Sequence, residues 1–350
     1  MSVAAEPVDR QLRNLPAPDG PRFKLTDRVW PASIGEAHVC LWPDDKLAAV
    51  TIGIDDNCAP DHAFWVELGE RTGYRFTWFV ITAAVGNEGP FFGTWDGFRE
   101  LLEAGHDVQS HTVTHLNPKR GFAGDLEADY RDSAVHLDEK LGPDPARVLA
   151  FPGGKNRDLN DPAVAAPFYM AVRGVQGTVN RANRTNYLRT SSIGGLKISE
   201  PRWANLEGLI NPESRLYRGW YSCHYHLLKD KSREDLLKAI DWLQAHDAEV
   251  WVGLWKDAAM YGQQRDTAEL ETLEASDERI RISLTDRMDD SRFTIPLTVK
   301  VRVPDGWSVV TLTQQAQQTE LTSIEHAGGR YVLAPVVPDA GEAVLEPSGG

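Results

Sequence analysis

Residues 47–54 of this 350-residue chain read LAAVTIGI and run directly into Asp55-Asp56-Asn57. The run is continuously apolar, carries β-branched residues and has the length of a single strand. Runs of this kind are typical of strands buried on both faces of a parallel sheet. The pattern therefore predicts a buried parallel strand that ends abruptly in two adjacent carboxylates.

Strand and helix patterns alternate after this run. Short apolar segments predict further strands at 75–82, 106–110, 148–151, 168–172, 187–192, 219–227 and 249–254. Helix patterns lie at 60–71, 94–104, 125–141 and 233–245, with Thr94 as a candidate N-cap. The alternation predicts an α/β fold, a distorted (β/α) barrel of about seven strands. We expect long loops over 180–212, where such folds often shape a substrate cleft.

The pattern changes near Asp266 and becomes a strand pattern with period two. No helix pattern follows Arg279, and apolar side chains alternate with other residues at Ile295, Leu297, Val299, Val301 and Val303. We therefore expect an N-terminal extension over 1–46, a barrel domain over 47–265 and a small all-β module over 277–350. Trp307 alone is a weak basis for a sugar-binding platform, which favours a structural role for this module.

Composition and charge exclude several classes of protein. Hydrophobic residues make up 41% of the chain and charged residues 25%, as in ordinary globular proteins. The net charge is −14 and no local basic patch is evident, so we expect no nucleic-acid partner. No apolar run reaches the roughly 18 to 20 residues that span a bilayer, so we expect no membrane span.

The compartment and the oligomeric state stay open. Cys40, Cys58 and Cys223 are odd in number and far apart, which does not indicate a disulfide framework. The segment Ser2–Ala5 is similar to the tail of a signal-cleavage site. We expect a secreted or periplasmic protein if a leader has been removed, and a cytoplasmic one otherwise.

Polar side chains follow several of the predicted strands, at the edge where the loops of a parallel α/β fold assemble a site. Asp55 and Asp56 repel each other unless a cation or a proton is near. Taken alone, this pair is a weak indication of a site, and a helix cap with a solvated neighbour is the favoured interpretation. The shared placement of the pair with other polar motifs is what indicates a functional site.

His111 and His115 are four residues apart in the segment SHTVTH. If that segment is helical, the two imidazoles lie on one face, with about 5 to 6 Å between their Cβ atoms. Two His and one Asp form a three-ligand set that leaves coordination positions open. A pair with this spacing can also arise by chance, so the motif predicts a metal site only together with the Asp pair.

His224 and His226 lie in a predicted strand, where period two sends both to the same side. One of them can reach the site, and the other is expected to be a hydrogen-bonded structural residue. The segment FPGGK, which contains Gly153, either offers backbone N–H donors to an oxyanion or is a simple turn. It is not a P-loop, because Leu149 and Asn156 stand where Gly and Ser or Thr are required.

The order of these motifs, TIGIDD, SHTVTH, FPGG and CHYH, resembles the polysaccharide deacetylase (NodB-homology) superfamily, which includes carbohydrate esterase family four. The resemblance covers about residues 47–261. It implies a barrel of about seven βα units and a divalent metal, most often zinc. By position, it implies that the metal ligands are Asp56, His111 and His115.

The same resemblance implies the catalytic residues. Asp55 would be the base and the Gly153 N–H the oxyanion donor. A late-strand His would be the general acid, and His226 is preferred over His224 because an apolar Leu-Leu pair follows it. The chain departs from the family pattern at Asn57, where Gly is usual.

A second departure concerns the residue that orients the base. Ala150 stands where the family commonly has an Arg, so the group that orients Asp55 must come from elsewhere. Arg173, after the fifth predicted strand, is a candidate.

The predicted activity is metal-assisted hydrolysis of N- or O-linked acetyl groups on an oligosaccharide or polysaccharide. One alternative is hydrolysis of a cyclic amide or imide, since the superfamily includes allantoinase-like and imidase-like members. Another is a carbohydrate-binding protein on a catalytically decayed barrel. A two-His-one-carboxylate iron oxygenase ranks lower, because the carboxylate lies far upstream of the first His.

Overall fold

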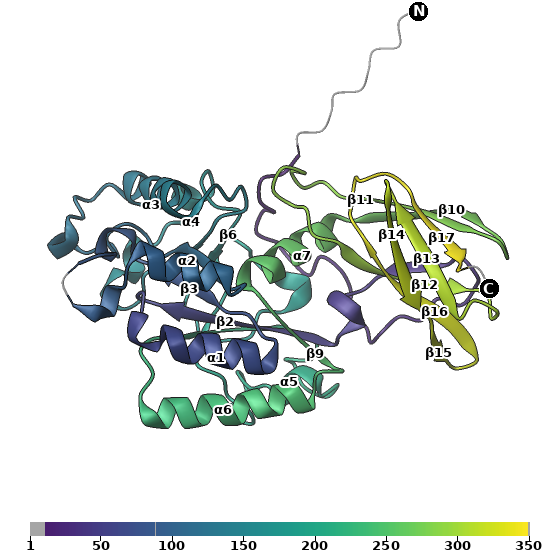
Figure 1. The fold of residues 1–350 in the computed structure, drawn as a ribbon, viewed down its shortest axis with the longest axis horizontal. Coiled ribbons are helices and arrows are strands. Elements are labelled where there is room, and N and C mark those ends of the chain that lie inside the picture. The colour runs from purple at the N-terminus through teal and green to yellow at the C-terminus, as the bar shows by residue number, and fades with distance from the viewer. Residues whose placement is uncertain (1–10, 88, 349–350) are drawn as a thin grey trace, which may run out of the picture.

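The computed structural model describes residues 11–87 and 89–348, so the segment Ser2–Ala5 lies outside the described residues. Figure 1 shows a parallel sheet with helices around it on one side of the molecule and antiparallel strands on the other. Helix α7 (Trp255–Thr267) lies between these two units. In the described ranges, none of the helices combines the length and the apolar character that crossing a bilayer requires.

The parallel sheet has the strand order β6-β5-β4-β3-β2-β8-β7, and β9 also pairs with β2. All of these pairings are parallel. The strands are β2 (Ala48–Asp55), β3 (Thr77–Val80), β4 (Asp107–Ser110), β5 (Val148–Ala150), β6 (Ala171–Arg173), β7 (Ile193–Gly194), β8 (Trp220–Tyr225) and β9 (Val250–Gly253). The predicted α/β class and the distorted (β/α) barrel are confirmed.

Strand β2 is the centre of this sheet, and all eight of its residues are buried. One edge of β2 pairs with β8. The first half of the other edge pairs with β9, and its end, Gly53–Asp55, pairs with β3. Because β2 has three neighbours, the sheet departs from a regular barrel at this point. The apolar run at 47–54 is thus the strand on which the sheet is assembled.

Helices cover the outside of the sheet (Figure 1). The Thr94 hydroxyl accepts a hydrogen bond from the Gly97 N–H, which confirms the predicted N-cap. The helix expected at 233–245 begins three residues earlier, at Asp230. The helices are α1 (His62–Thr72), α2 (Trp95–Glu103), α3 (Leu126–Leu141), α4 (Pro162–Ala165), α5 (Glu207–Ile210), α6 (Asp230–Ala245) and α7.

The strand predicted at 187–192 does not form as a regular strand, and only the short β7 follows it. The segment instead runs beside β6 and makes a single bridge, between Thr190 and Arg173. The Val172 N–H donates to the Tyr187 carbonyl at 2.7 Å. The segment is therefore held beside β6 by isolated backbone hydrogen bonds, without a continuous β-ladder. It lies within the region that we expected to be mostly loop.

The antiparallel unit consists of two sheets, ordered β1-β12-β16-β15 and β10-β11-β17-β13-β14. The strand predicted from the period-two pattern is confirmed as β12, where the four residues with odd numbers from Leu297 to Val303 are fully buried. Thr298 and Lys300 are buried as well, so burial itself does not alternate along this strand. The strands are β1 (Ala37–Val39), β10 (Glu269–Ala275), β11 (Ile280–Thr285), β12 (Leu297–Val303), β13 (Val309–Gln314), β14 (Gln317–Thr322), β15 (Ile324–His326), β16 (Gly329–Val336) and β17 (Ala343–Pro347).

These two sheets also take strands from outside 277–350. Strand β1 comes from the N-terminal extension and pairs with β12, and β10 precedes residue 277. Trp307 is 4% exposed and its indole N–H donates to the Asp277 carbonyl. Its ring is therefore part of the packing of this unit and is not free to stack on a sugar.

Candidate metal centre and active site

A cavity of about 420 Å³ lies at the carboxyl end of the parallel sheet. It brings together seven of the eight residues that the sequence singled out, and Arg173 lies buried behind one of them. Two further residues, Asn156 and Val175, complete the lining. The seven are Asp55, Asp56, His111, His115, Gly153, His224 and His226.

The Asp pair stands on a tight turn at the end of β2. Asp56, Asn57 and Cys58 all have positive φ angles, of 60°, 68° and 43°. Asp and Asn tolerate this left-handed region better than most residues with side chains. The Asn57 carboxamide accepts from the Ile81 N–H and donates to the Phe92 carbonyl, at 2.9 and 3.0 Å. These bonds explain how Asn replaces the usual Gly at this position.

The segment that carries His111 and His115 is a turn after β4. The spacing predicts a shared face for the two imidazoles only if this segment is helical. Thr112 and His115 have positive φ angles of 70° and 58°. The His115 N–H donates to the Thr112 hydroxyl, and the Thr114 hydroxyl donates to Asp129 of α3. The turn still brings the two imidazole centroids to 4.8 Å, so the predicted proximity holds for a different structural reason.

Asp56 and the two imidazoles form a cluster whose ligand atoms all lie within 4.8 Å of one another. The Oδ1 atom of Asp56 is 3.5 Å from Nε2 of His111 and 3.4 Å from Nε2 of His115. In the described part of the chain this buried oxygen has no hydrogen-bond partner. A buried carboxylate oxygen without a partner is costly unless a positive charge lies beside it. These three residues fit a divalent metal.

The orientation of His111 supports this interpretation. Its Nδ1–H donates to the Ala150 carbonyl at 2.8 Å, and because a carbonyl only accepts, the Nε2 lone pair faces Asp56. Such outer-shell hydrogen bonds fix the tautomer of metal-binding histidines. Ala150, which departs from the family pattern, thus contributes through its backbone.

The electrostatics of the cluster show how strongly it attracts positive charge. Burial opposes protonation of His111, but the neighbouring carboxylates of Asp56 and Asp55 outweigh it and raise the pKa of His111. Burial and the neighbouring His111 lower the pKa of His115 to about 4, so His115 is neutral at pH 7. A proton and a metal ion therefore compete for this cluster, and metal affinity should fall in acid.

Asp55 lies beside the cluster and is held by Arg173. The Nη2 atom of Arg173 is 2.6 and 2.7 Å from the two carboxylate oxygens, and both side chains are buried. Burial alone would raise the pKa of Asp55. The Arg173 guanidinium, with smaller contributions from the histidines, instead holds that pKa well below its ordinary value. Asp55 is therefore ionised at neutral pH.

The position of Arg173 depends on packing inside the barrel. Its guanidinium lies 4.7 Å from the ring centroid of Phe79, a cation–π arrangement. A Cβ atom added at Gly53 would come within 3.0 Å of that ring. Gly53 thus leaves room for the ring on which the guanidinium stacks.

His224 and His226 both line the cavity, as their period-two spacing predicted. Nδ1 of His224 shares a 2.8 Å hydrogen bond with the Ser192 hydroxyl. Burial lowers the pKa of His224 to about 4, although Asp55 partly offsets it. The His226 side chain is 55% exposed, and its Nε2 lies 3.7 Å from Oδ2 of Asp56. The two imidazoles therefore differ in access, because His226 is exposed and His224 is partly buried.

Sequence reasoning missed the residues that support these groups. Asn156 donates from Nδ2 to the His115 carbonyl at 2.7 Å. Ser192 ends the segment 187–192, whose strand pattern gave no indication of a contact with His224. The one signal for Asn156 was its position just after the Gly-rich segment.

Comparison with known protein families gives a match for the N-terminal part of the parallel barrel. Residues 47–167 match the family model described as "Polysaccharide deacetylase". The match contains Asp55, Asp56, His111, His115 and Gly153, and it ends before β6. The resemblance drawn from the motifs is confirmed over this range.

A gellan lyase from a Bacillus species is 35% identical over 376 aligned residues, which cover 98% of this chain and 15% of that protein. The chain thus spans only a small part of that relative. A family 4 carbohydrate esterase from Bacillus anthracis has 13% identity, 63% and 96% coverage of the two chains and a TM-score of 0.35. The Streptococcus pyogenes deacetylase PplD in complex with acetate has 20% identity, 54% and 69% coverage and a TM-score of 0.33. Likenesses this weak transfer no activity to this chain.

Removing a residue of the cluster should abolish metal retention. We expect Asp56→Asn and His115→Ala to weaken zinc binding by more than about 100-fold, because loss of outer-shell partners alone costs 10- to 100-fold. Zinc content after dialysis against a weak chelator measures this directly. The matched control is His246→Ala at the end of α6, which should retain zinc like the unmodified protein. Full zinc content in Asp56→Asn would contradict the assignment.

Proposed function

We propose that this chain, whose residues 47–167 belong to the polysaccharide deacetylase family, is a metal-dependent hydrolase that removes acetyl groups from a saccharide. The observation that carries the proposal is that one cavity brings together three kinds of side-chain group. These are the Asp56-His111-His115 cluster, an ionised Asp55 beside it and His226 at its open side.

The three ligand atoms suit zinc, which binds imidazole nitrogen and carboxylate oxygen and keeps positions open in catalytic sites. When bound, such a cation supplies a Lewis acid that makes water a stronger nucleophile and polarises an acyl oxygen. The chain supplies the remaining chemistry from its own residues.

Asp55 serves in this proposal as the proton acceptor. It is ionised at neutral pH, lies next to the ligand Asp56 and lines the same cavity. A carboxylate in this position hydrogen-bonds a water molecule and takes its proton as that water attacks the acyl carbon. Arg173 keeps the carboxylate in one orientation, so it is a positioning residue.

The Gly153 backbone lines the same cavity as the two carboxylates, and in this proposal its N–H is the donor to the developing oxyanion. Removal of one such donor typically costs about 3 to 4 kcal/mol of transition-state stabilisation. A backbone donor costs little reorganisation, because the Gly-rich turn already fixes its direction.

His226 is the better candidate for the general acid. The pKa of His224 is about 4, so its imidazole is neutral at pH 7, and its Nδ1 is already hydrogen-bonded to Ser192. A neutral imidazole is a poor general acid. His226 is open to solvent at the mouth of the cavity and lies near the carboxylate of Asp56, so it is the imidazole placed to reach a leaving group. His224 then acts as a hydrogen-bonded support beside it.

A second candidate function, hydrolysis of a cyclic amide or imide, would use the same residues and differs in its product. A decayed carbohydrate-binding protein is disfavoured by the intact constellation of ligands and proposed base. The gellan lyase name concerns a protein of which this chain spans 15%, so lyase activity is not proposed here.

Acetate release tests the proposal. The zinc-loaded chain should release acetate from N-acetylated or O-acetylated oligosaccharides, and Asp55→Asn should reduce the rate by at least about 100-fold, as expected for loss of a general base. Enzymatic acetate determination measures the product. Ring opening of small ureides without acetate release would favour the cyclic-amide alternative and overturn the proposal.

The two histidines should differ. We expect His226→Ala to lower kcat by about 100-fold or more, as for loss of a general acid, with unchanged zinc content. His224→Ala, the matched variant two residues away, should lower kcat less. Turnover of His226→Ala within a few-fold of the unmodified enzyme would move the acid role to His224.

Arg173→Gln should lower kcat by about 10- to 100-fold, the range for loss of an orienting partner, while zinc is retained. Arg173→Lys keeps the charge and should recover part of that loss. Thermal unfolding checks that both variants fold. Equal kcat for Arg173→Gln and the unmodified enzyme would show that Asp55 needs no such partner.

A further inference from the structure

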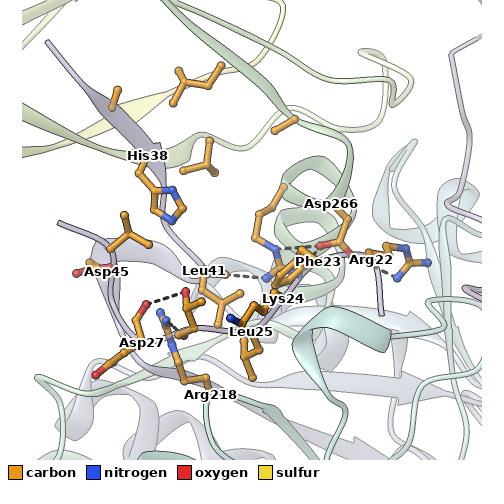
Figure 2. Close-up of a pocket in the computed structure, with 17 residues that line it drawn as sticks. Arg22, Phe23, Lys24, Leu25, Asp27, His38, Leu41, Asp45, Arg218 and Asp266 are labelled. Atoms are coloured by element: carbon orange, nitrogen blue, oxygen red, sulfur yellow. Dashed lines mark hydrogen bonds and ion pairs between the residues drawn. The ribbon is translucent and has the colours of Figure 1, made fainter. Parts of the chain in front are cut away.

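A second cavity, of about 470 Å³, lies between the parallel barrel and the antiparallel sheets (Figure 2). Its walls come from the N-terminal segment 22–29, from β1, from Arg218 just before β8 and from the end of α7. Arg218 lies just before the first residue of β8 and His226 just after its last, so the two cavities lie at opposite ends of this strand, and they share no lining residue. The cavity is therefore distinct from the candidate active site.

Arg218 is a buried cation in this cavity, and the carboxylates of Asp45 and Asp27 attract it from beyond ion-pair distance. The residue is 4% exposed and has a left-handed φ of 60°. Its Nη1 donates to the Thr26 carbonyl at 2.7 Å, while its buried Nε has no acceptor in the described ranges. No ion pair of Arg218 exists among the described residues. A buried guanidinium left in this state favours an anionic group beside it.

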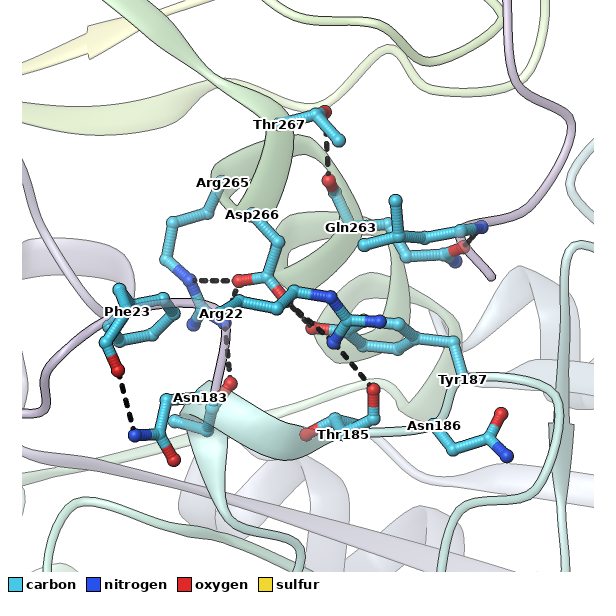
Figure 3. Close-up of polar contacts among 12 residues, drawn as sticks. Arg22, Phe23, Asn183, Thr185, Asn186, Tyr187, Gln263, Arg265, Asp266 and Thr267 are labelled. Carbon is cyan, nitrogen blue, oxygen red and sulfur yellow. Dashed lines mark hydrogen bonds and ion pairs between the residues drawn. The ribbon is translucent and has the colours of Figure 1, made fainter. Parts of the chain in front are cut away.

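The floor of the cavity carries a second excess of positive charge (Figure 3). The buried carboxylate of Asp266 pairs with Arg265 at 2.6 Å and with Arg22 at 3.3 Å. The Tyr187 hydroxyl also donates to it, at 3.0 Å. Two guanidinium groups thus share one carboxylate, and the group as a whole keeps a positive charge.

Of the other two carboxylates of the cavity, Asp45 is ion-paired, whereas Asp27 makes no ion pair among the described residues. Asp45 lies 2.5 Å from Nζ of Lys300, and Asp27 accepts from the Tyr217 hydroxyl at 2.7 Å. Lys24 lies on the exposed rim and makes no ion pair within the described part of the chain. The lining carries four cationic side chains and three carboxylates, and Lys300 pairs with one of those carboxylates. In a protein of net charge −14, the cavity therefore keeps a small excess of positive charge.

The remaining walls are apolar, with Phe23, Leu25 and Leu41 among the lining residues. Apolar and aromatic faces suit the C–H face of a sugar ring, while guanidinium groups suit carboxylates. The volume is within the 300 to 1,000 Å³ of small-molecule sites.

We propose that this cavity binds a sugar unit that carries a carboxylate, with Arg218 as its principal contact and Lys24 at the rim. It is a binding site at the end of the barrel opposite the metal cluster, and it holds an acidic saccharide against the junction of the two units. The proposal does not depend on the removal of acetyl groups.

Calorimetric titration of the full chain with glucuronate, glucose and acetate tests the proposal. Glucuronate should bind at least about 10-fold more tightly than either of the others, because it alone combines the ring with the charge. Arg218→Gln should weaken glucuronate binding by about 10- to 100-fold, the range for loss of a hydrogen bond to a charged group. Equal binding of glucose and glucuronate would overturn the proposal, as would tighter binding of glucose 6-phosphate.

Two further variants keep the test decisive if Arg218→Gln does not fold. Lys24→Glu reverses an exposed charge at the rim and should weaken glucuronate binding by several-fold, whereas Lys229→Glu, near the other end of β8, should not. His115→Ala disrupts the metal cluster and should leave glucuronate binding unchanged. Loss of binding in His115→Ala would place the ligand at the metal cluster and overturn the proposal, while acetate release remains a separate question.

Discussion

The structure at the carboxyl end of the barrel depends on one unsatisfied oxygen. Oδ1 of Asp56 is buried, lacks a hydrogen-bond partner in the described chain and faces two imidazole nitrogens at 3.4 to 3.5 Å. A cation satisfies all three groups at once, whereas a single proton satisfies only one contact. The left-handed turns at Asp56 and at Thr112 to His115 are local strain that this arrangement maintains.

The second carboxylate is stabilised in a different way. Asp55 directly precedes Asp56, and two adjacent anions in a buried site would repel each other strongly. Arg173 from β6 neutralises Asp55, so the charge of Asp56 remains available for a metal. Ala150, where the family commonly has the Arg, uses its carbonyl to orient His111. Arg173 thus supplies a positive charge beside Asp55 from a different strand.

Local patterns predicted the parts of the fold in which local and tertiary preferences agree. The apolar run at 47–54, the Thr94 cap and the period-two pattern of β12 each carry their signal in adjacent residues. The segment 187–192, expected as a regular strand, makes only a single bridge to β6. No local pattern reveals that long-range pairing. Pairing of β1 with β12 joins residues more than 250 positions apart, beyond the reach of any periodicity.

The candidate site shows the same division. Motif order brought seven of the eight singled-out residues to one cavity, and Arg173 was found beside Asp55. The proximity of His111 and His115 was predicted for a helix and arises from a turn, because positive φ angles at Thr112 and His115 cannot be inferred from their spacing. The supporting role of a residue such as Ser192 depends on a tertiary contact with His224, which its place in a predicted strand does not reveal.

Anomalous X-ray diffraction at the zinc edge, on crystals of the zinc-loaded protein, tests the central claim most directly. The metal cluster predicts one strong peak, about 2.0 to 2.2 Å from Asp56 Oδ1 and from Nε2 of His111 and of His115. A peak at the other acidic cluster of the described chain, Asp286, Asp290 and Asp339, with none at Asp56, would contradict it.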